Sequence, residues 1–216
     1  NDNEICLFDE KKENLLARLN CLRQQKPQGI RPNFCLADFI KPASELMEDH
    51  IGAFAVSAGK GVEEMCLEYE NNNDDYSSIM LKAIADRLAE ALAEYMHERV
   101  RKEFWGYAKD ENLTNEELIK EKYKGIRPAP GYPACPDHSE KVKLFSLLNS
   151  ENIVDISLTE NFAMYPAASV SGWYFSHPDS KYFGVGKIGQ DQVKAISDSR
   201  GEPIEMTKKF LRPNLD

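Results

Sequence analysis

The chain has 216 residues, of which 42% are hydrophobic and 29% are charged, the balance of an ordinary folded protein rather than a disordered one. Its formal net charge of −9 argues against a nucleic-acid-binding surface, which would need clustered lysine and arginine. No apolar run approaches the roughly 18 residues that cross a membrane, and the first residues do not resemble a signal peptide.

The cysteines indicate the redox setting. There are five of them, an odd number, and no two form a CxxC pair. This pattern argues against a disulfide framework or a zinc knuckle, so we expect a reducing, cytoplasmic environment. The opening stretch "NDNEICLF" predicts a strand, and its lack of an initiator methionine suggests a piece of a longer polypeptide.

The first half of the chain alternates strand and helix patterns. Residues 9–25 carry leucines at 15, 16, 19 and 22, a helical spacing. Residues 51–59, "IGAFAVSAG", predict a buried strand, and residues 62–70 a short helix. The strongest pattern covers residues 76–107 and predicts one long amphipathic helix of about 45 Å. Its apolar face comprises Ile79, Met80, Ile84, Leu88, Ala91, Leu92, Tyr95, Met96, Val100 and Phe104.

A proline-rich loop lies between two capped helices. Thr114 and Glu117 have capping-box spacing for a helix that Gly125 ends, and Asp137 and Glu140 are the cap pair of the next helix. Between them, "GIRPAPGYPACPDH" (125–138) has four prolines, which exclude a helix or a central strand. We therefore expect a loop of fixed shape.

The C-terminal third is richer in β-branched and aromatic residues. Residues 155–166, 168–178 and 181–188 predict strands, the last two joined by the turn "HPDS", and residues 190–201 and 203–215 predict helices. We expect a single α+β domain with a twisted, largely antiparallel sheet flanked by helices. "GVGKIG" (184–189) matches a dinucleotide-binding pattern in spacing alone, because no strand follows it, and we reject it.

Two further groups have polar chemistry but ordinary explanations. Cys135 and His138 could be half of a metal site, yet no second ligand pair stands at a suitable distance, so a packed cysteine and a cap-proximal histidine are favoured. Asp86, Glu90 and His97 share one helix flank, which from spacing alone is most simply solvated.

The loop residues suggest a ligand. Arg127 follows a helix end and can hold a carboxylate with two parallel hydrogen bonds. Prolines leave carbonyl groups without amide donors between them, which suits a cation, and Tyr132, Tyr182 and Phe183 offer aromatic faces. S-adenosylmethionine has a carboxylate, a heteroaromatic ring and a positive centre. A structural loop over a core would also contain arginine and tyrosine.

Three stretches resemble a known family. "DRLAEALAEYMHERVRKEFWGY" (86–107), "GIRPAPGYPACPDH" (125–138) and "SVSGWYFSHPDSKYF" (169–183) are similar to the C-terminal activation domain of cobalamin-dependent methionine synthase. The resemblance covers nearly all of residues 1–216, which we interpret as that domain without the N-terminal portion of the family domain. That portion contributes an acidic contact to S-adenosylmethionine in the family.

The resemblance implies a function. In the family, oxidised cob(II)alamin is returned to methylcobalamin by reductive methylation, with the methyl group from S-adenosylmethionine and an electron from a flavodoxin-type protein. The cobalamin belongs to a neighbouring domain or a partner chain, and the isolated chain is not expected to make methionine alone. Two alternatives remain: a docking module for a cobalamin protein without productive ligand binding, and a generic methyltransferase.

The resemblance also assigns roles to individual positions. Arg127 matches the arginine that holds the ligand, and Tyr182 with Phe183 matches a second binding segment. Ala134 is expected to offer backbone contacts. Glu90 and Tyr132 match residues near the ligand or the corrin, and Asp86 matches a residue that meets the histidine displaced from cobalt. The family chemistry requires positioning rather than proton transfer, so we assign no catalytic acid or base and no metal ligand.

Overall fold

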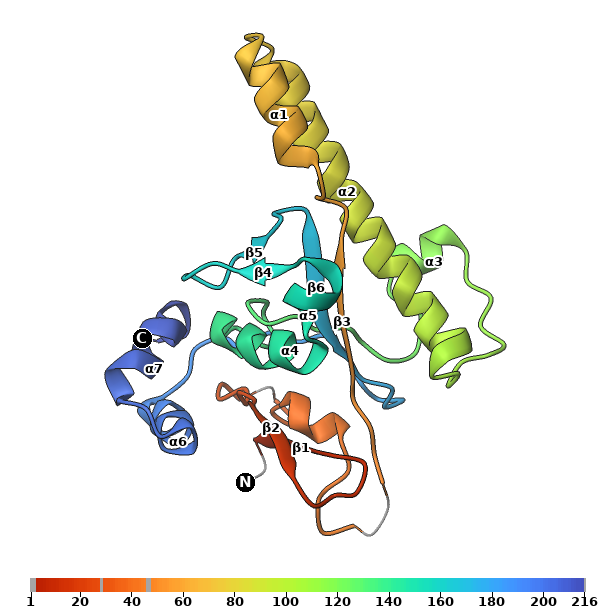
Figure 1. Cartoon of the computed structure of the whole chain (residues 1–216). Coiled ribbons are helices and arrows are strands. Elements are labelled where there is room, and N and C mark those ends of the chain that lie inside the picture. The colour runs from red at the N-terminus through yellow and green to blue at the C-terminus, as the bar shows by residue number, and fades with distance from the viewer. Residues whose placement is uncertain (1–2, 28, 46–47, 216) are drawn as a thin grey trace. The chain divides into compact units, whose positions relative to one another are not determined.

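The computed structural model describes residues 3–27, 29–45 and 48–215 (Figure 1). The chain divides into two compact units, neither of them continuous in sequence. The first contains the chain up to Gly52, Lys124–Leu147 and the chain from Trp173, and the second contains Ala53–Tyr123 and Leu148–Gly172.

The first unit opens with an antiparallel hairpin of β1 (Glu4–Phe8) and β2 (Leu15–Asn20). The expected helix around residues 15–22 is therefore wrong. The carboxylate of Asp9 accepts hydrogen bonds from the Glu13 N–H and the Asn14 side chain, at 2.9 and 2.6 Å, and so stabilises the turn between the strands. In the resulting register Leu19 lies opposite Ile5, and both side chains are buried. Pairing with β1 therefore overrides the weak helical preference of this segment.

Several helices and one irregular segment follow in the first unit. They are η1 (Leu36–Phe39), η3 (His138–Glu140), α4 (Lys141–Leu148, its last residue in the second unit), α6 (Gln190–Arg200), α7 (Ile204–Leu211) and η4 (Arg212–Asn214). The two expected C-terminal helices are confirmed. Residues 181–188, expected as a strand, form a segment that is neither helix nor strand, with a φ of 72° at Gly186. Its apolar side chains join α6 and α7 in a core of Leu22, Val185, Ile188, Val193, Ile196 and Leu211.

The second unit contains the other strands. β3 (Gly52–Ser57) pairs with β6 (Ser169–Tyr174), whose last two residues belong to the first unit, and β4 (Ser157–Leu158) pairs antiparallel with β5 (Met164–Tyr165). The α+β class is confirmed, and within the described ranges the strands form three two-stranded sheets instead of one. α5 (Ser150–Val154) is short, and α3 (Asn115–Ile119) has the expected capping box but ends before Gly125.

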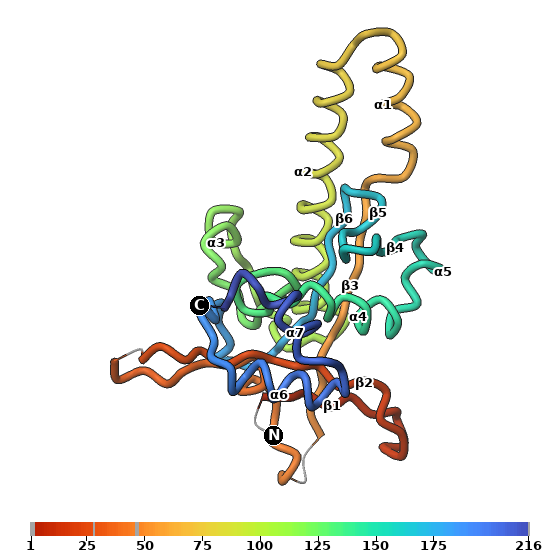
Figure 2. The backbone as a smooth tube through the Cα atoms, turned by 90° about the vertical axis from the view of Figure 1, so that its left-hand side faces the viewer, coloured from red at the N-terminus to blue at the C-terminus, as the bar shows by residue number. Residues whose placement is uncertain are grey.

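The predicted long helix is confirmed as α2 (Asp75–Arg99), which continues in a π-helical turn, η2 (Val100–Phe104). α1 (Val62–Asn71) packs beside it (Figures 1 and 2). The large apolar residues of α2 do not form its buried face, since Ile84, Leu88 and Tyr95 are 50%, 58% and 54% exposed. The buried side chains of α2 are instead mostly small: Ser78, Ala85, Ala89, Ala93 and His97.

Candidate functional site

The proline loop is paired with the chain that follows β6. Ile126 and Phe175 exchange both backbone hydrogen bonds, at 3.0 and 2.9 Å, and the Pro128 carbonyl accepts the Trp173 N–H at 2.9 Å. The Pro133 carbonyl accepts the Val185 N–H, also at 2.9 Å. We expected these proline carbonyls to suit a cation. The structure uses two of them to anchor the loop, because neighbouring prolines offer no amide donors to pair with them.

A tight turn forms the tip of the loop. The Cys135 N–H donates to the Tyr132 carbonyl at 2.9 Å, and the Gly131 N–H donates to the Cys135 carbonyl at 2.7 Å. Gly131 has a φ of 98°, and a Cβ there would lie 2.3 Å from Cε1 of His138. Glycine is therefore required by its backbone angle and by the imidazole that packs against it.

Arg127 and Tyr182, predicted from separate motifs, are joined in the first unit. The Arg127 backbone N–H donates a hydrogen bond to the Tyr182 phenolic oxygen at 3.0 Å. The Arg127 side chain is half-buried and that of Tyr182 is 37% exposed. The structure thus places the Arg127 backbone beside the hydroxyl group of a partly accessible tyrosine.

The other predicted residues of this unit differ in exposure. Tyr132 is 62% exposed, whereas Ala134 is buried. The Phe183 ring packs against Phe34 and Phe39, with centroid distances of 6.0 and 6.4 Å. The Phe183 ring is thus half-buried in an aromatic cluster.

Asp86 and Glu90 lie on α2 in the second unit, and both are exposed. Asp86 pairs with Arg87 at 2.8 Å and lines a cavity of about 300 Å³, together with Glu63, Lys82 and a floor of Gly59 and Pro166. Cavities of this size hold small ligands or a protruding side chain. His97, by contrast, is not on a solvated flank: it is fully buried and packs edge-on against Tyr123 at 4.9 Å.

Cys135 and His138 agree with the packed interpretation. Burial raises the pKa of the Cys135 thiol well above its usual range, and the negative charges of Glu140 and Asp137 add to the shift. Partial desolvation and the Lys141 ammonium, 2.8 Å from Nδ1, lower the pKa of His138. Cys135 is therefore a neutral thiol at neutral pH and not an activated nucleophile.

Sequence reasoning missed a buried cluster of charges at the end of the loop. Arg200 of α6 contacts Asp137 and Glu140 at 2.5 and 2.7 Å, and all three side chains are at most 10% exposed. Asp137 and Glu140 were recognised as cap residues, and Asp137 does cap η3. Nothing in their spacing could indicate an arginine 60 residues further along the chain.

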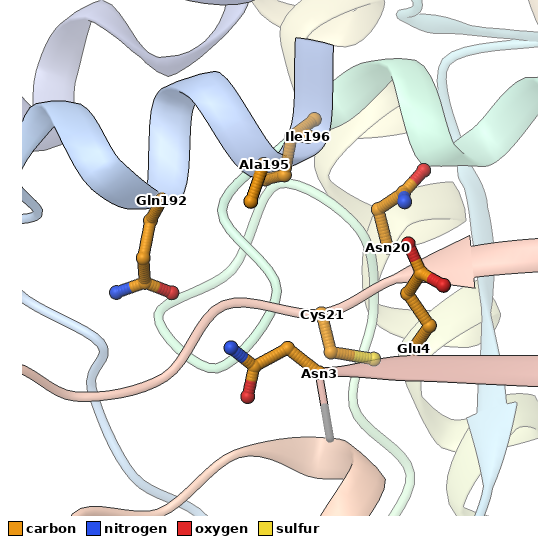
Figure 3. A pocket seen from close by; sticks show the side chains of 7 residues that line it. All are labelled: Asn3, Glu4, Asn20, Cys21, Gln192, Ala195 and Ile196. Atoms are coloured by element: carbon orange, nitrogen blue, oxygen red, sulfur yellow. The ribbon is translucent and has the colours of Figure 1, made fainter. Parts of the chain in front are cut away.

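The remaining features do not add a ligand site. A cavity of about 10 Å³ lies between α6 and the β1–β2 hairpin, with Asn20, Cys21 and Gln192 in its wall (Figure 3). It has room for about one water molecule. In the described ranges, no group of three or more His, Cys, Asp or Glu side chains could hold a metal ion. No helix there is long and apolar enough to span a membrane.

The described residues form an α+β module with an anchored proline loop, and comparisons with known proteins show its family. Residues 1–201 match the family described as "Vitamin B12 dependent methionine synthase, activation domain". The chain belongs to this family.

A similar solved structure has the description "Crystal Structure of the MetH Reactivation Domain bound to AdoHcy". This chain is 50% identical to it, with a TM-score of 0.96 over 99% of this chain. The match spans 66% of the length of that structure's chain.

Proposed function

We propose that the chain is the S-adenosylmethionine-binding reactivation module of a cobalamin-dependent methionine synthase. In methionine biosynthesis it would support the reductive methylation of cob(II)alamin to methylcobalamin. The observation that carries the proposal is the likeness, at 50% identity, to a reactivation domain with AdoHcy bound. AdoHcy is what S-adenosylmethionine becomes when it gives up its methyl group.

The residues of the first unit fit this ligand. The Arg127 guanidinium would hold the carboxylate, and the rings of Tyr132 and Tyr182 would lie against the adenine or the sulfonium. Ala134 and Phe183 would contribute backbone groups. The hydrogen bond from the Arg127 N–H to Tyr182 supports this assignment, because it keeps the two ligand-binding segments in a fixed relation.

The proposed reaction requires the chain to position the ligand and not to transfer a proton. S-adenosylmethionine, when bound, supplies an already activated sulfonium methyl group. The protein would orient that methyl group and exclude water. The cobalamin would be held by a neighbouring domain or a partner chain, with the electron coming from a flavodoxin-type donor, all in the cytoplasm. The isolated chain would not make methionine.

The second unit would meet the cobalamin-bearing domain. Glu90 would lie near the ligand or the corrin, and Asp86 would accept a hydrogen bond from the histidine that is displaced from cobalt. The cavity beside Asp86 supports this role, because its volume of about 300 Å³ exceeds what an imidazole needs.

Calorimetric titration with S-adenosylmethionine tests the proposal. The wild type should bind, and Arg127→Ala should weaken binding about tenfold or more, which is about 1.4 kcal/mol. Arg212→Ala, which removes an exposed arginine of the same unit, is the matched control and should bind like the wild type. Absence of binding by the wild type would favour a module that only docks on a cobalamin protein.

A further inference from the structure

The proline loop ends in a buried cluster of charges that the proposed ligand site does not use. Asp137 follows the loop directly and caps η3, because its Oδ1 accepts the Ser139 N–H at 2.8 Å. Its other oxygen, Oδ2, receives Nη2 of Arg200 at 2.5 Å. The same Nη2 contacts Oε1 of Glu140 at 2.7 Å. One guanidinium therefore joins the carboxylate at the loop end to the carboxylate one turn later.

A second set of hydrogen bonds fixes the position of Glu140. Oε1 of Glu140 also accepts from Lys143 Nζ at 2.7 Å, and Asn20 Oδ1 accepts from Lys143 Nζ at 2.9 Å and from Arg200 Nε at 3.3 Å. The cluster thus connects β2, α4 and α6, three elements of one unit.

The electrostatics make Arg200 the critical member. Burial alone would lower the pKa of the Arg200 guanidinium, but the charges and hydrogen bonds of Asp137 and Glu140 outweigh burial and raise it. Asp137 and Glu140 are only 4% and 2% exposed. Without Arg200 they would be two close, like charges out of water, with Lys143 still paired with Glu140, an arrangement that strongly favours their separation.

The loop is anchored at several points along its length. Its start is paired with Phe175, and Pro133 is held by Val185, whereas Asp137 is held by Arg200. Tyr132 and Ala134 lie between these anchors. If Asp137 turned toward water, the turn that contains the hydrogen bond between Gly131 and Cys135 would lose its fixed end.

We propose that Arg200 is a positioning residue for the ligand loop: by holding Asp137 and Glu140 together it sets the conformation of residues 127–135. Its effect on ligand affinity rests on the proposed function, but its effect on loop order does not. Arg200 itself would not touch S-adenosylmethionine.

The test compares Arg200→Met with wild type by amide hydrogen exchange. In Arg200→Met the Gly131 and Cys135 amides should exchange about tenfold faster or more, as expected when a hydrogen bond to a charged group is lost. The Val193 amide, inside α6, should change much less. Arg101→Met is the matched control, because Arg101 forms a buried pair with Glu111 in the second unit. In Arg101→Met, the exchange rates of the loop amides should change no more than the loss of global stability accounts for.

Ligand affinity is the second readout. S-adenosylmethionine should bind Arg200→Met about tenfold more weakly than wild type, and Arg200→Lys, which keeps a charge but contacts fewer oxygens, should fall between them. Unchanged loop exchange in Arg200→Met would overturn the inference, whether or not the ligand binds. If Arg200→Met does not fold, the same comparison is made with Arg200→Lys. The inference is then overturned if the loop exchange rates and the ligand affinity of Arg200→Lys both equal those of the wild type. A wild type that does not bind while Arg200→Met loosens the loop would refute the proposed function and support the positioning role.

Discussion

The backbone N–H of Arg127 donates a 3.0 Å hydrogen bond to the phenolic oxygen of Tyr182, so two segments 55 residues apart in sequence form one surface. Arg127 and Tyr182 were each predicted from their own motif. The hydrogen bond between the Arg127 backbone and the Tyr182 hydroxyl joins the two segments, so its loss should affect both the stability of the loop and the proposed ligand site.

Tyr182→Phe should separate these two segments. The ring remains, but the Arg127 amide loses its acceptor, which should cost about 0.5–1.5 kcal/mol of unfolding free energy. S-adenosylmethionine affinity should fall with it. Urea unfolding and calorimetry measure both effects. Tyr76→Phe, at a tyrosine that is 73% exposed, is the control, and an equal response of the two variants would show that the hydrogen bond contributes nothing.

Gly131→Ala should be strongly destabilising. The new methyl group would meet the His138 ring, and the φ of 98° is unfavourable for any residue with a Cβ, for a combined cost of about 2–4 kcal/mol. Gly186→Ala tests the backbone angle alone, since its φ is 72° and no atom lies within 4 Å of its Cβ position. The thermal unfolding midpoint of Gly131→Ala should lie well below that of Gly186→Ala. Adding His138→Ala should recover part of the difference, and no recovery would contradict the steric explanation.

Arg101 should be the most costly ion-pair residue of the second unit to replace. Its side chain is fully buried, contacts Glu111 at 2.7 and 2.9 Å, and lies 4.4 Å from the centre of the Tyr123 ring. Arg101→Met leaves the Glu111 charge without its partner and should cost about 3–5 kcal/mol. Lys102→Met removes the pair that the next residue forms with Glu98, whose side chains are 35% and 37% exposed, and should cost under about 0.5 kcal/mol. Denaturant unfolding would contradict this account if the two variants were equally stable.

Stability should fall as the solution becomes mildly acidic. The pKa of His138 lies below its ordinary 6.5 in the folded protein, because of partial desolvation and the Lys141 charge. As the pH falls, the unfolded chain therefore binds a proton at His138 before the folded chain does. The contribution of His138 to the free energy of unfolding is complete above pH 6.5 and is lost as pH falls from 6.5 toward the folded pKa. Unfolding midpoints from pH ~7.5 to ~5.5 should decline less for His138→Asn than for wild type. Parallel pH profiles would show that His138 is not responsible.

Local patterns predicted the helices well where the pattern was long or capped. The helix of residues 75–99, the Thr114–Glu117 capping box and the two C-terminal helices appear as expected, because caps and helical periodicity act within a few residues. The proline loop was predicted for the same reason, since proline restricts its own backbone whatever surrounds it.

The failures all depend on partners distant in sequence. Leu15 and Leu16 have helical spacing, but pairing with β1 makes their segment a strand. Residues 181–188 have strand composition, but no strand lies beside them. On α2, several large apolar side chains are exposed and the alanines are buried. Composition cannot reveal which face is buried, because this depends on how closely the neighbouring backbone approaches the helix.

The sequence by itself determined the α+β class, the long helix, the rigid loop and the family to which the chain belongs, because each of these is written in contiguous residues. Only the tertiary structure decided that Arg127 meets Tyr182, that Gly131 must accommodate His138, and that Arg200 holds the loop through Asp137 and Glu140. Such contacts depend on residues 7 to 63 positions apart that packing brings together, and no local preference encodes them.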